Sequence, residues 1–315
     1  MTNSTTVRLF LLGDLHLSTT GPAIPLECPN LGRLDVDAIV SIGDVIDDNR
    51  DHAPDASAGE AYERRGREFF ERLDTVDVPV LAVPGNHDPI GTTRRLTDGL
   101  DNVAVLHRRA VDGGELDETL GGIRFAGWGC EQFDLTPAFR YDRYPGVVPE
   151  SVGYDGIDRR ATQIAETVEA AVGGYLAGRY TASEAAAELG VGPEFRASCA
   201  DELTELKTTF ERIREVVAPA TTTTMVLSHE SPFHVAFDYH HSAEGLSARL
   251  HRGSIPLKIA IIDNGPNVVF SGHMHSRGRD AIETVAGYAD VYNPGSPGVA
   301  IADGDVGTGS LRIVE

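Results

Sequence analysis

Residues Val7–His16 read VRLFLLGDLH, an aliphatic run that ends abruptly in Gly13, Asp14 and His16. Short continuous apolar runs of this kind are typical of strands that are buried on both faces. The same arrangement, an apolar run that ends abruptly in polar residues, returns four more times along the chain. The five runs are Val7–Leu12, Ala38–Ile42, Val78–Val83, Thr224–Leu227 and Val268–Phe270.

The segment between the second and third runs has a helical pattern. In Glu60–Leu73, the residues Tyr62, Phe69, Phe70 and Leu73 fall on one stripe, which gives the strand, helix, strand alternation of an α/β fold. Four weaker strand patterns follow, and we expect these to build a second, more antiparallel sheet. They are Val103–Leu106, Ile123–Gly127, Asp290–Tyr292 and Gly298–Ala302.

The region Pro137–Thr221 interrupts the strand rhythm and predicts a helical insertion within a single domain spanning residues 1–315. Thr181 and Glu184 have capping-box spacing, and Gly190 is placed to end the short helix that they begin. Two longer helical stripes flank it: Ile164, Val168 and Val172, and then Leu203, Leu206, Phe210 and Ile213. The insertion is either a lid over the functional site or a remote decoration.

Charge is the most unusual feature of the composition. The formal net charge of -21 comes from 48 acidic against 27 basic residues, and Lys207 and Lys258 are the only lysines. Such a surface resembles proteins of extreme halophiles, in which concentrated salt screens the repulsion between carboxylates. It argues against a nucleic-acid-binding face, because phosphate backbones are normally bound by lysine and arginine clusters.

Targeting signals and cysteine spacing indicate a cytoplasmic protein. Met1–Thr6 is polar, and no apolar run approaches the roughly 18 residues of a membrane span, so we expect neither a signal peptide nor a membrane helix. Cys28, Cys130 and Cys199 lie far apart and are odd in number, which predicts no disulfide framework and fits a reducing compartment.

All five strand-like runs end in residue types that bind metals. Sites in α/β sheets form where the carboxyl ends of strands meet. Oxygen and imidazole ligands without thiolate suit manganese, iron, zinc or nickel, and the set is large enough for two cations. The motifs are Gly13-Asp14-Leu15-His16, Gly43-Asp44, Gly85-Asn86-His87-Asp88, Ser228-His229-Glu230 and Gly272-His273-Met274-His275.

In this order the motifs resemble the calcineurin-like metallophosphoesterase superfamily, whose signature is Asp-x-His, Gly-Asp, Gly-Asn-His-Asp/Glu, a lone His and Gly-His-x-His. The resemblance spans Leu9 to about Ser276 without the insertion. It implies a four-layer αββα sandwich of two mixed β-sheets flanked by helices. It also implies a hydrolase of phosphomonoesters or phosphodiesters with two divalent metal ions, manganese first and iron, zinc or nickel as alternatives.

The resemblance further implies a role for each ligand. Asp14, His16 and His275 would hold one metal, Asn86, His229 and His273 the other, and Asp44 would bridge the two. The two aspartates offset only half of the charge of two divalent cations, so the site keeps positive charge for a phosphate. Metals roughly 3.5–4 Å apart lower the pKa of a bridging water and clamp an in-line displacement, which predicts hydroxide attack without a covalent enzyme intermediate.

The resemblance implies that His87 binds no metal and faces the substrate as general acid or charge stabiliser, for which the titration range of histidine is suitable. Asp88 either orients His87 or caps a turn. Asp47 matches Gly-Asp-x-x-Asp and is expected to support the ligands through hydrogen bonds.

Departures from relatives narrow the substrate class. Asp47 is followed by Asp48 and Asn49, and His87 by Asp88, unlike the Asp-Arg-Gly and Asn-His-Glu of Ser/Thr protein phosphatases. The segment Asn293-Pro294-Gly295-Ser296 resembles a turn near the site of small bacterial and archaeal phosphodiesterases, although an ordinary β-turn explains it equally. A small nucleotide-like phosphate ester is therefore favoured over a protein substrate.

Two alternatives stay open. One is a DNA-repair-type exonuclease of the same superfamily, which basic contacts in an accessory region would favour, and the other is a non-catalytic metal-binding scaffold, which the complete motif set disfavours. Residues flanking the motifs are candidate substrate contacts: Arg140, Arg143, His234, His240, His241, Arg249 and Arg252.

Overall fold

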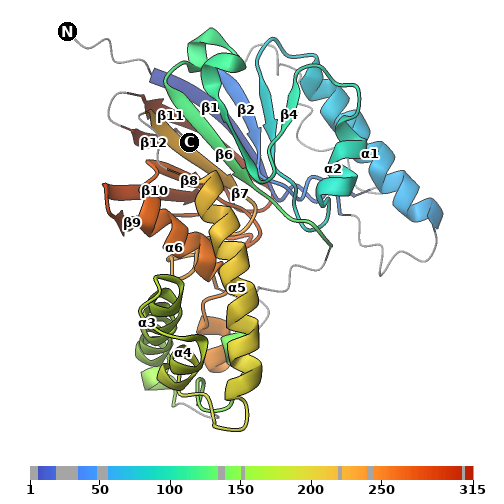
Figure 1. Ribbon diagram of the computed structural model, residues 1–315. Coiled ribbons are helices and arrows are strands. Elements are labelled where there is room, and N and C mark those ends of the chain that lie inside the picture. The colour runs from blue at the N-terminus through green and yellow to red at the C-terminus, as the bar shows by residue number, and fades with distance from the viewer. Residues whose placement is uncertain are drawn as a thin grey trace.

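A computed structural model describes residues 6–18, 35–47, 56–133, 139–149, 153–218, 222–239, 244–306 and 309–314. In these ranges the chain forms two mixed six-stranded sheets that pack face to face, with helices on both outer sides (Figure 1). The predicted αββα sandwich is confirmed.

The first sheet has the order β12-β11-β1-β2-β3-β4. The strands β1 to β4 are mutually parallel, and β11 pairs with β1 in the antiparallel sense. Their bounds are β1 Thr6–Gly13, β2 Ala38–Ser41, β3 Val80–Ala82, β4 Val103–Val105, β11 Gly298–Asp305 and β12 Ser310–Val314.

The second sheet has the order β5-β6-β7-β8-β10-β9. Its four central strands are parallel, and β5 and β9 are antiparallel edges. The bounds are β5 Arg109–Asp112, β6 Ile123–Trp128, β7 Thr223–Ser228, β8 Val268–Phe270, β9 Gly278–Thr284 and β10 Gly287–Asn293.

This arrangement corrects the expected second sheet. The patterns at Val103–Leu106 and Gly298–Ala302 became β4 and β11 of the first sheet, and the second sheet is parallel at its centre rather than mainly antiparallel. Hydrophobic patterning reports that a strand is covered and does not report which strand lies beside it. The edge strands β5, β9 and β12 were missed because they carry no continuous apolar run.

Three buried clusters correspond to the three interfaces of the sandwich. On β1, Leu9 and Leu11 face the second sheet, whereas Phe10 and Leu12 face the helix α1 (Ala56–Asp74). Burial on both faces explains why residues Leu9–Leu12 of β1 are continuously apolar. The predicted helix is confirmed, and Phe69, Phe70 and Leu73 are its buried stripe.

Helices cover both outer faces. The first sheet carries α1 and α2 (Ile90–Thr97), and the second carries α6 (Ile255–Asn264) and α5 (Arg196–Val216) (Figure 1). Short 3-10 turns lie at Gly113–Glu115, Glu118–Leu120, Tyr141–Arg143, Tyr154–Gly156 and Gly245–Arg249. Among the described residues no helix is long and apolar enough to span a membrane.

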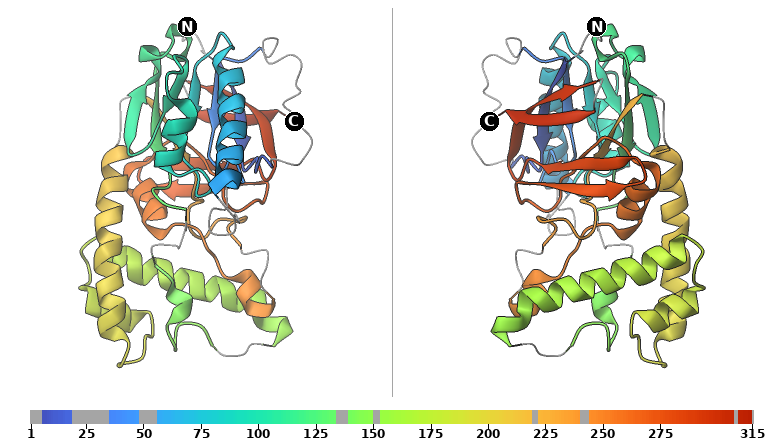
Figure 2. Two further views of the ribbon diagram at one scale, coloured as in Figure 1. Left: turned by 90° about the vertical axis from the view of Figure 1, so that its right-hand side faces the viewer. Right: turned by 90° about the vertical axis from the view of Figure 1, so that its left-hand side faces the viewer.

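The expected insertion contains α3 (Ile157–Leu176), α4 (Ala182–Glu188) and α5, and both predicted stripes are buried. Thr181 and Glu184 form the predicted capping box, and Gly190 follows the short helix at positive φ. Figures 1 and 2 show α3 and α4 apart from the sheets. The helix α5 extends from the second sheet to these two helices. Phe210 and Ile213 of α5 share a core with that sheet, so α5 also belongs to the sandwich.

Candidate metal centre

The five motifs meet at one edge of the sandwich, where the carboxyl ends of strands from both sheets come together. The side chains are arranged as follows: Asp14 and His16 follow β1, Asp44 follows β2, Asn86 and His87 follow β3, His229 follows β7, and His273 and His275 follow β8. The site therefore lies on the seam between the two sheets.

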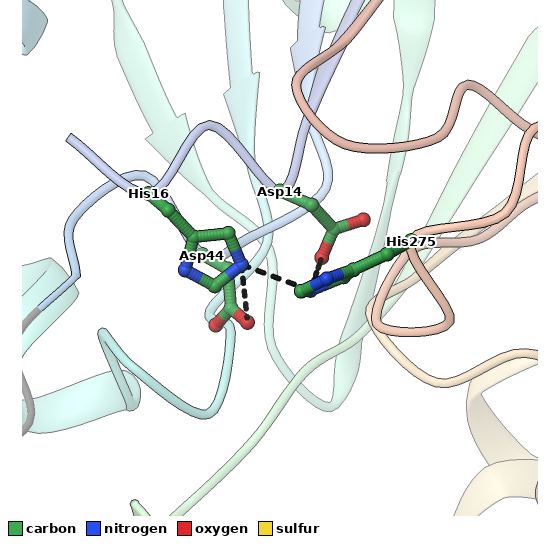
Figure 3. Close-up of side chains that lie close together, drawn as sticks. All are labelled: Asp14, His16, Asp44 and His275. Atoms are coloured by element: carbon green, nitrogen blue, oxygen red, sulfur yellow. Dashed lines mark hydrogen bonds and ion pairs between the residues drawn. The ribbon is translucent and has the colours of Figure 1, made fainter. Parts of the chain in front are cut away.

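One group consists of Asp14, His16, Asp44 and His275, whose potential ligand atoms all lie within 4.8 Å of one another (Figure 3). The Nε2 atoms of His16 and His275 are 2.9 Å apart. His16 Nε2 is 3.8 Å from Asp44 Oδ2, and His275 Nε2 is 3.9 Å from Asp14 Oδ1. Four donors thus converge on a space the size of a cation.

A second group shares Asp44 with the first. Ligand atoms of Asp44, His229 and His273 also lie within 4.8 Å of one another, and His229 Nε2 is 3.3 Å from Asp44 Oδ2. Asn86 Oδ1 joins them, 2.9 Å from His229 Nε2 and 3.0 Å from His273 Nδ1. The structure therefore brings together all seven side chains that were expected to bind metal, in two groups with Asp44 common to both.

The backbone of these residues is strained in a consistent way. Seven described residues other than glycine have positive φ, and five of them belong to the candidate site: Asp14, His16, Asp44, His273 and His275. A left-handed conformation is costly for side chains with a Cβ, and it persists where surrounding contacts enforce it. The strain turns each side chain sharply from its strand end towards the shared space.

The close approach of the turns after β2 and β3 explains why residue 85 is a glycine. A Cβ on Gly85 would lie 2.1 Å from the backbone nitrogen of Asp44, so no other residue fits there without moving the chain. The contact brings the turns after β2 and β3 together and places Asn86 beside Asp44.

Buried charge at the site is only partly compensated by the protein itself. Burial raises the pKa of Asp14 to about 7, against the lowering effect of His229. Burial acts on Asp44 in the same direction, but the charge and hydrogen bond of His229, together with the charges of His87 and His16, outweigh it and lower the pKa of Asp44. Burial alone would lower the pKa of His229, whereas Asp44 raises it to about 10. A divalent cation competes for these lone pairs and supplies the same compensation, so the donor set fits a metal.

His87 lies beside the first group and forms a third set of potential ligands with His16 and Asp47, whose ligand atoms lie within 4.8 Å of one another. Its ring is 4.7 Å from that of His16 and 5.3 Å from that of Phe133. Asp47 Oδ1 lies 3.5 Å from His87 Nδ1 and 3.6 Å from His16 Nδ1. One carboxylate thus faces both imidazoles. Phe133 was missed by sequence reasoning, since no motif marks it.

The contacts of Asp88 favour a role in bracing the turns. Its carboxylate accepts hydrogen bonds from the backbone N–H groups of Asp44, Val45 and Gly85. These bonds fasten the turn after β3 to the turn after β2. The carboxylate near the His87 ring is that of Asp47, so orientation of His87 by Asp88 remains a prediction without a supporting contact.

The candidate substrate contacts are dispersed. Arg252 lines a small cavity with His273 and Met274, and its guanidinium pairs with Asp142 at 2.8 Å. The other described candidates are placed as follows: Arg140 pairs with Asp142, Arg249 with Asp158 and His234 with Glu169, and Arg143 is exposed. His240 and His241 lie outside the described residues. Arg252 alone among those described shares a cavity with a candidate metal ligand.

Comparison with known proteins agrees with this geometry. The family model described as calcineurin-like phosphoesterase matches residues 7–162, which include the first three motifs. A solved crystal structure superimposes with a TM-score of 0.54 at 13% identity, covering 98% of this chain and 99% of the other. At that identity the likeness shows the fold alone. The comparison with curated proteins gave no match.

Proposed function

The chain belongs to the calcineurin-like phosphoesterase family, and from this premise we propose that it hydrolyses small phosphomonoesters or phosphodiesters with two divalent metal ions. The observation that carries the proposal is the pair of ligand groups that share Asp44. A carboxylate shared by two ligand groups would hold two cations close together, as two-metal hydrolysis requires.

The two groups of side chains would each bind one metal ion. Asp14, His16 and His275 would hold one ion, Asn86, His229 and His273 the other, and Asp44 both. Two cations bound there would polarise the phosphoryl oxygens and lower the pKa of a water between them. Manganese suits this mixture of carboxylate, amide and imidazole ligands, with iron, zinc or nickel as alternatives.

His87 supplies the proton. Asp47 Oδ1 lies 3.5 Å from its Nδ1 and 3.6 Å from that of His16, so one carboxylate is placed to orient both a metal ligand and the acid. This leaves His87 Nε2 for the substrate, where it donates a proton to the leaving oxygen. A histidine placed in this way favours an enzyme over a non-catalytic scaffold.

A small, nucleotide-like substrate is the class we propose, because Asp48, Asn49 and Asp88 depart from the protein-phosphatase pattern. The cavity beside His273 has a volume of about 20 Å³, room for about one water, and Leu206 of α5 and Phe139 are among its lining residues. Glu169 of α3 reaches His234, in the segment after β7, at 3.0 Å. We propose that the insertion 137–221 acts as a lid that limits substrate size.

The cellular setting is part of the same proposal. The cysteines Cys130 and Cys199 are free and buried, which suits a reducing cytoplasm, whereas Cys28 lies outside the described residues. The acidic composition suits a halophilic cell.

Turnover of a panel of phosphomonoesters and phosphodiesters, measured with Mn²⁺ in high salt, tests the function. We expect metal-dependent release of phosphate or alcohol from several esters and loss of that release with a chelator. Asp201→Asn, on the exposed face of α5, is a matched control for aspartate substitutions at the site. Absence of turnover in a protein shown to hold two metals would contradict the enzyme assignment.

A further inference from the structure

The proposed metal ligands come from two different sheets. Asp14, Asp44 and Asn86 follow strands of the first sheet, and His229 and His273 follow strands of the second. Both metals would therefore be held across the seam, and the spacing of the sheets at this edge would set the distances between ligands. Such distances must be held to within about 0.5 Å for a productive site.

Two connections cross from one sheet to the other at this edge, β4 to β5 and β10 to β11, and the second is bonded to the loops that carry candidate ligands. The strand β10 ends at Asn293 in the second sheet, and β11 begins at Gly298 in the first. We call the segment Asn293–Ser296 the crossover turn. Asn293 is fully buried, and the register of β11 on β1 pairs Gly298 with Gly13, one residue before Asp14.

At one end, the crossover turn is bonded to the loop that follows β8. The amide nitrogen Nδ2 of Asn293 donates to Gly272 O at 2.9 Å, and Oδ1 accepts from Gly295 N at 2.8 Å. Ser231 Oγ donates to the same Gly272 carbonyl at 3.1 Å. Gly272 immediately precedes His273, so these bonds fix the origin of a loop that carries two candidate ligands.

At its other end, the crossover turn is bonded to the loop that follows β1. Ser296 Oγ donates to the backbone carbonyl of Asp14 at 2.7 Å. The two loops also touch directly, because His273 N donates to Asp14 Oδ1 at 2.9 Å. A Cβ on Gly272 would come within 2.9 Å of Asp14 Oδ2, which shows how little space separates them.

We propose that Asn293 and Ser296 are positioning residues that hold the two halves of the metal centre at the separation needed for a metal pair. The inference rests on the proposed function for the metals themselves. Asn293 fixes the loop that carries His273 and His275, and these two histidines would bind different metals. Ser296 fixes the loop that carries Asp14 and His16, and both of these residues would bind the same metal. The sequence shows the turn but not that its two ends bind loops from opposite sheets.

We expect substitutions of the two residues to lower metal affinity in different ways. Asn293→Ala should weaken both metals, because its loop contributes a ligand to each. Ser296→Ala should weaken mainly the metal held by Asp14, His16 and His275. Loss of groups that orient metal ligands typically lowers metal affinity about 10–100-fold, which is the size we expect. Ser296→Thr keeps the hydroxyl and should restore most of the affinity.

Mn²⁺ titration by calorimetry, together with EPR of the loaded protein, separates positioning from general stability. Two Mn²⁺ ions that share a carboxylate give an exchange-coupled signal, which should weaken in Asn293→Ala and give way to a mononuclear signal in Ser296→Ala. The matched control is Asn102→Ala, since Asn102 also braces the backbone through its amide, donating to Val76 O and Val78 O far from the site. That variant should lose thermal stability and keep both metals.

Wild-type Mn²⁺ affinities and an intact coupled signal in Ser296→Ala would overturn the proposal, even if Asn293→Ala failed to fold. A loss of stability in Asn293→Ala equal to that in Asn102→Ala, with metal binding unchanged, would overturn it for Asn293. Neither result depends on turnover. A wild-type protein that binds two coupled Mn²⁺ ions but hydrolyses no ester would instead contradict the proposed function and leave the positioning role standing.

Discussion

Asp44 is the side chain on which both proposed metals depend. Its carboxylate belongs to both ligand groups, and His229 and His16 lie 3.3 and 3.8 Å from its Oδ2 atom. Asp44→Asn keeps the shape and removes the charge that offsets the repulsion between two cations. We expect turnover to be abolished and the metal content to fall below two per chain, as elemental analysis of the purified variant would show.

The control for this variant is Asp201→Asn, which removes one negative charge from the exposed face of α5. It should retain both metals and wild-type turnover. An Asp44→Asn protein with two metals and near-normal activity would show that the carboxylate does not bridge them.

His87 carries a second prediction about a single side chain. His87→Gln should keep both metals, because the ring lies outside the two ligand groups that share Asp44, and should lower the rate roughly 10²–10⁴-fold, the usual scale for positioned proton transfer. The loss should be smaller for p-nitrophenyl esters, whose leaving oxygen hardly needs a proton. Rates measured on paired activated and unactivated esters test this.

Equal losses on both kinds of ester would rule out proton donation and leave charge stabilisation as the role of His87. Asp47→Asn extends the test, because Asp47 faces His87 Nδ1. If Asp47 orients the acid, its variant should show the same dependence on leaving group with a smaller loss.

The helices α3 and α4 carry the prediction about the lid. The chain offers a natural point for their removal, because Gly192 N donates to Pro145 O at 3.4 Å and a Cβ on Gly146 would lie 2.3 Å from Gly190 O. The two ends of the excised segment are therefore already in contact. Replacing residues 148–189 with a short Gly/Ser linker removes α3 and α4 and leaves α5, which is part of the sandwich core.

Both metals should stay bound in the excised variant, and hydrolysis of small aryl esters should be largely intact. Relative rates on larger diesters should rise, because the segment after β7 loses its cover of α3. Glu169→Ala is the control, since it cuts the contact with His234 and keeps the helices. Unchanged selectivity across a size series, in an excised protein shown to be folded and metal-loaded, would make the insertion a decoration.

The charge of the whole molecule predicts a dependence on salt. With a net charge of -21, carboxylates repel one another most when the Debye length is long, about 10 Å at 0.1 M and about 3 Å at 1 M. Exposed acids line the helices, as Glu205 and Glu211 do on α5. The melting temperature should therefore rise steeply with potassium chloride, and activity should be highest in molar salt.

Calorimetric melting between about 0.1 M and about 2 M potassium chloride measures this effect. Potassium sulfate at matched ionic strength is a useful comparison, because sulfate also strengthens apolar burial. A melting temperature that does not change with potassium chloride would contradict halophilic adaptation while leaving the metal chemistry untouched.

Local sequence determined which segments are buried strands, where each strand ends and which ligand types stand there. Mainly apolar runs such as Val7–Leu12 indicate burial on both faces. The polar residues that follow these runs are then expected at a sheet edge. The capping box at Thr181 and the stripe of Phe69, Phe70 and Leu73 were equally readable, because helix caps and periodicity are local properties.

Tertiary structure alone decided the assignment of strands to sheets and the contacts across the seam. Asn86 Oδ1 and His273 Nδ1 lie 3.0 Å apart although 187 positions separate the two residues along the chain. Likewise the pairing of β11 with β1, and the bonds from Asn293 to Gly272 and from Ser296 to Asp14, join segments that are separated along the chain. A hydrophobic pattern indicates that a strand is buried, and only the packing of the two sheets determines which strands lie beside it.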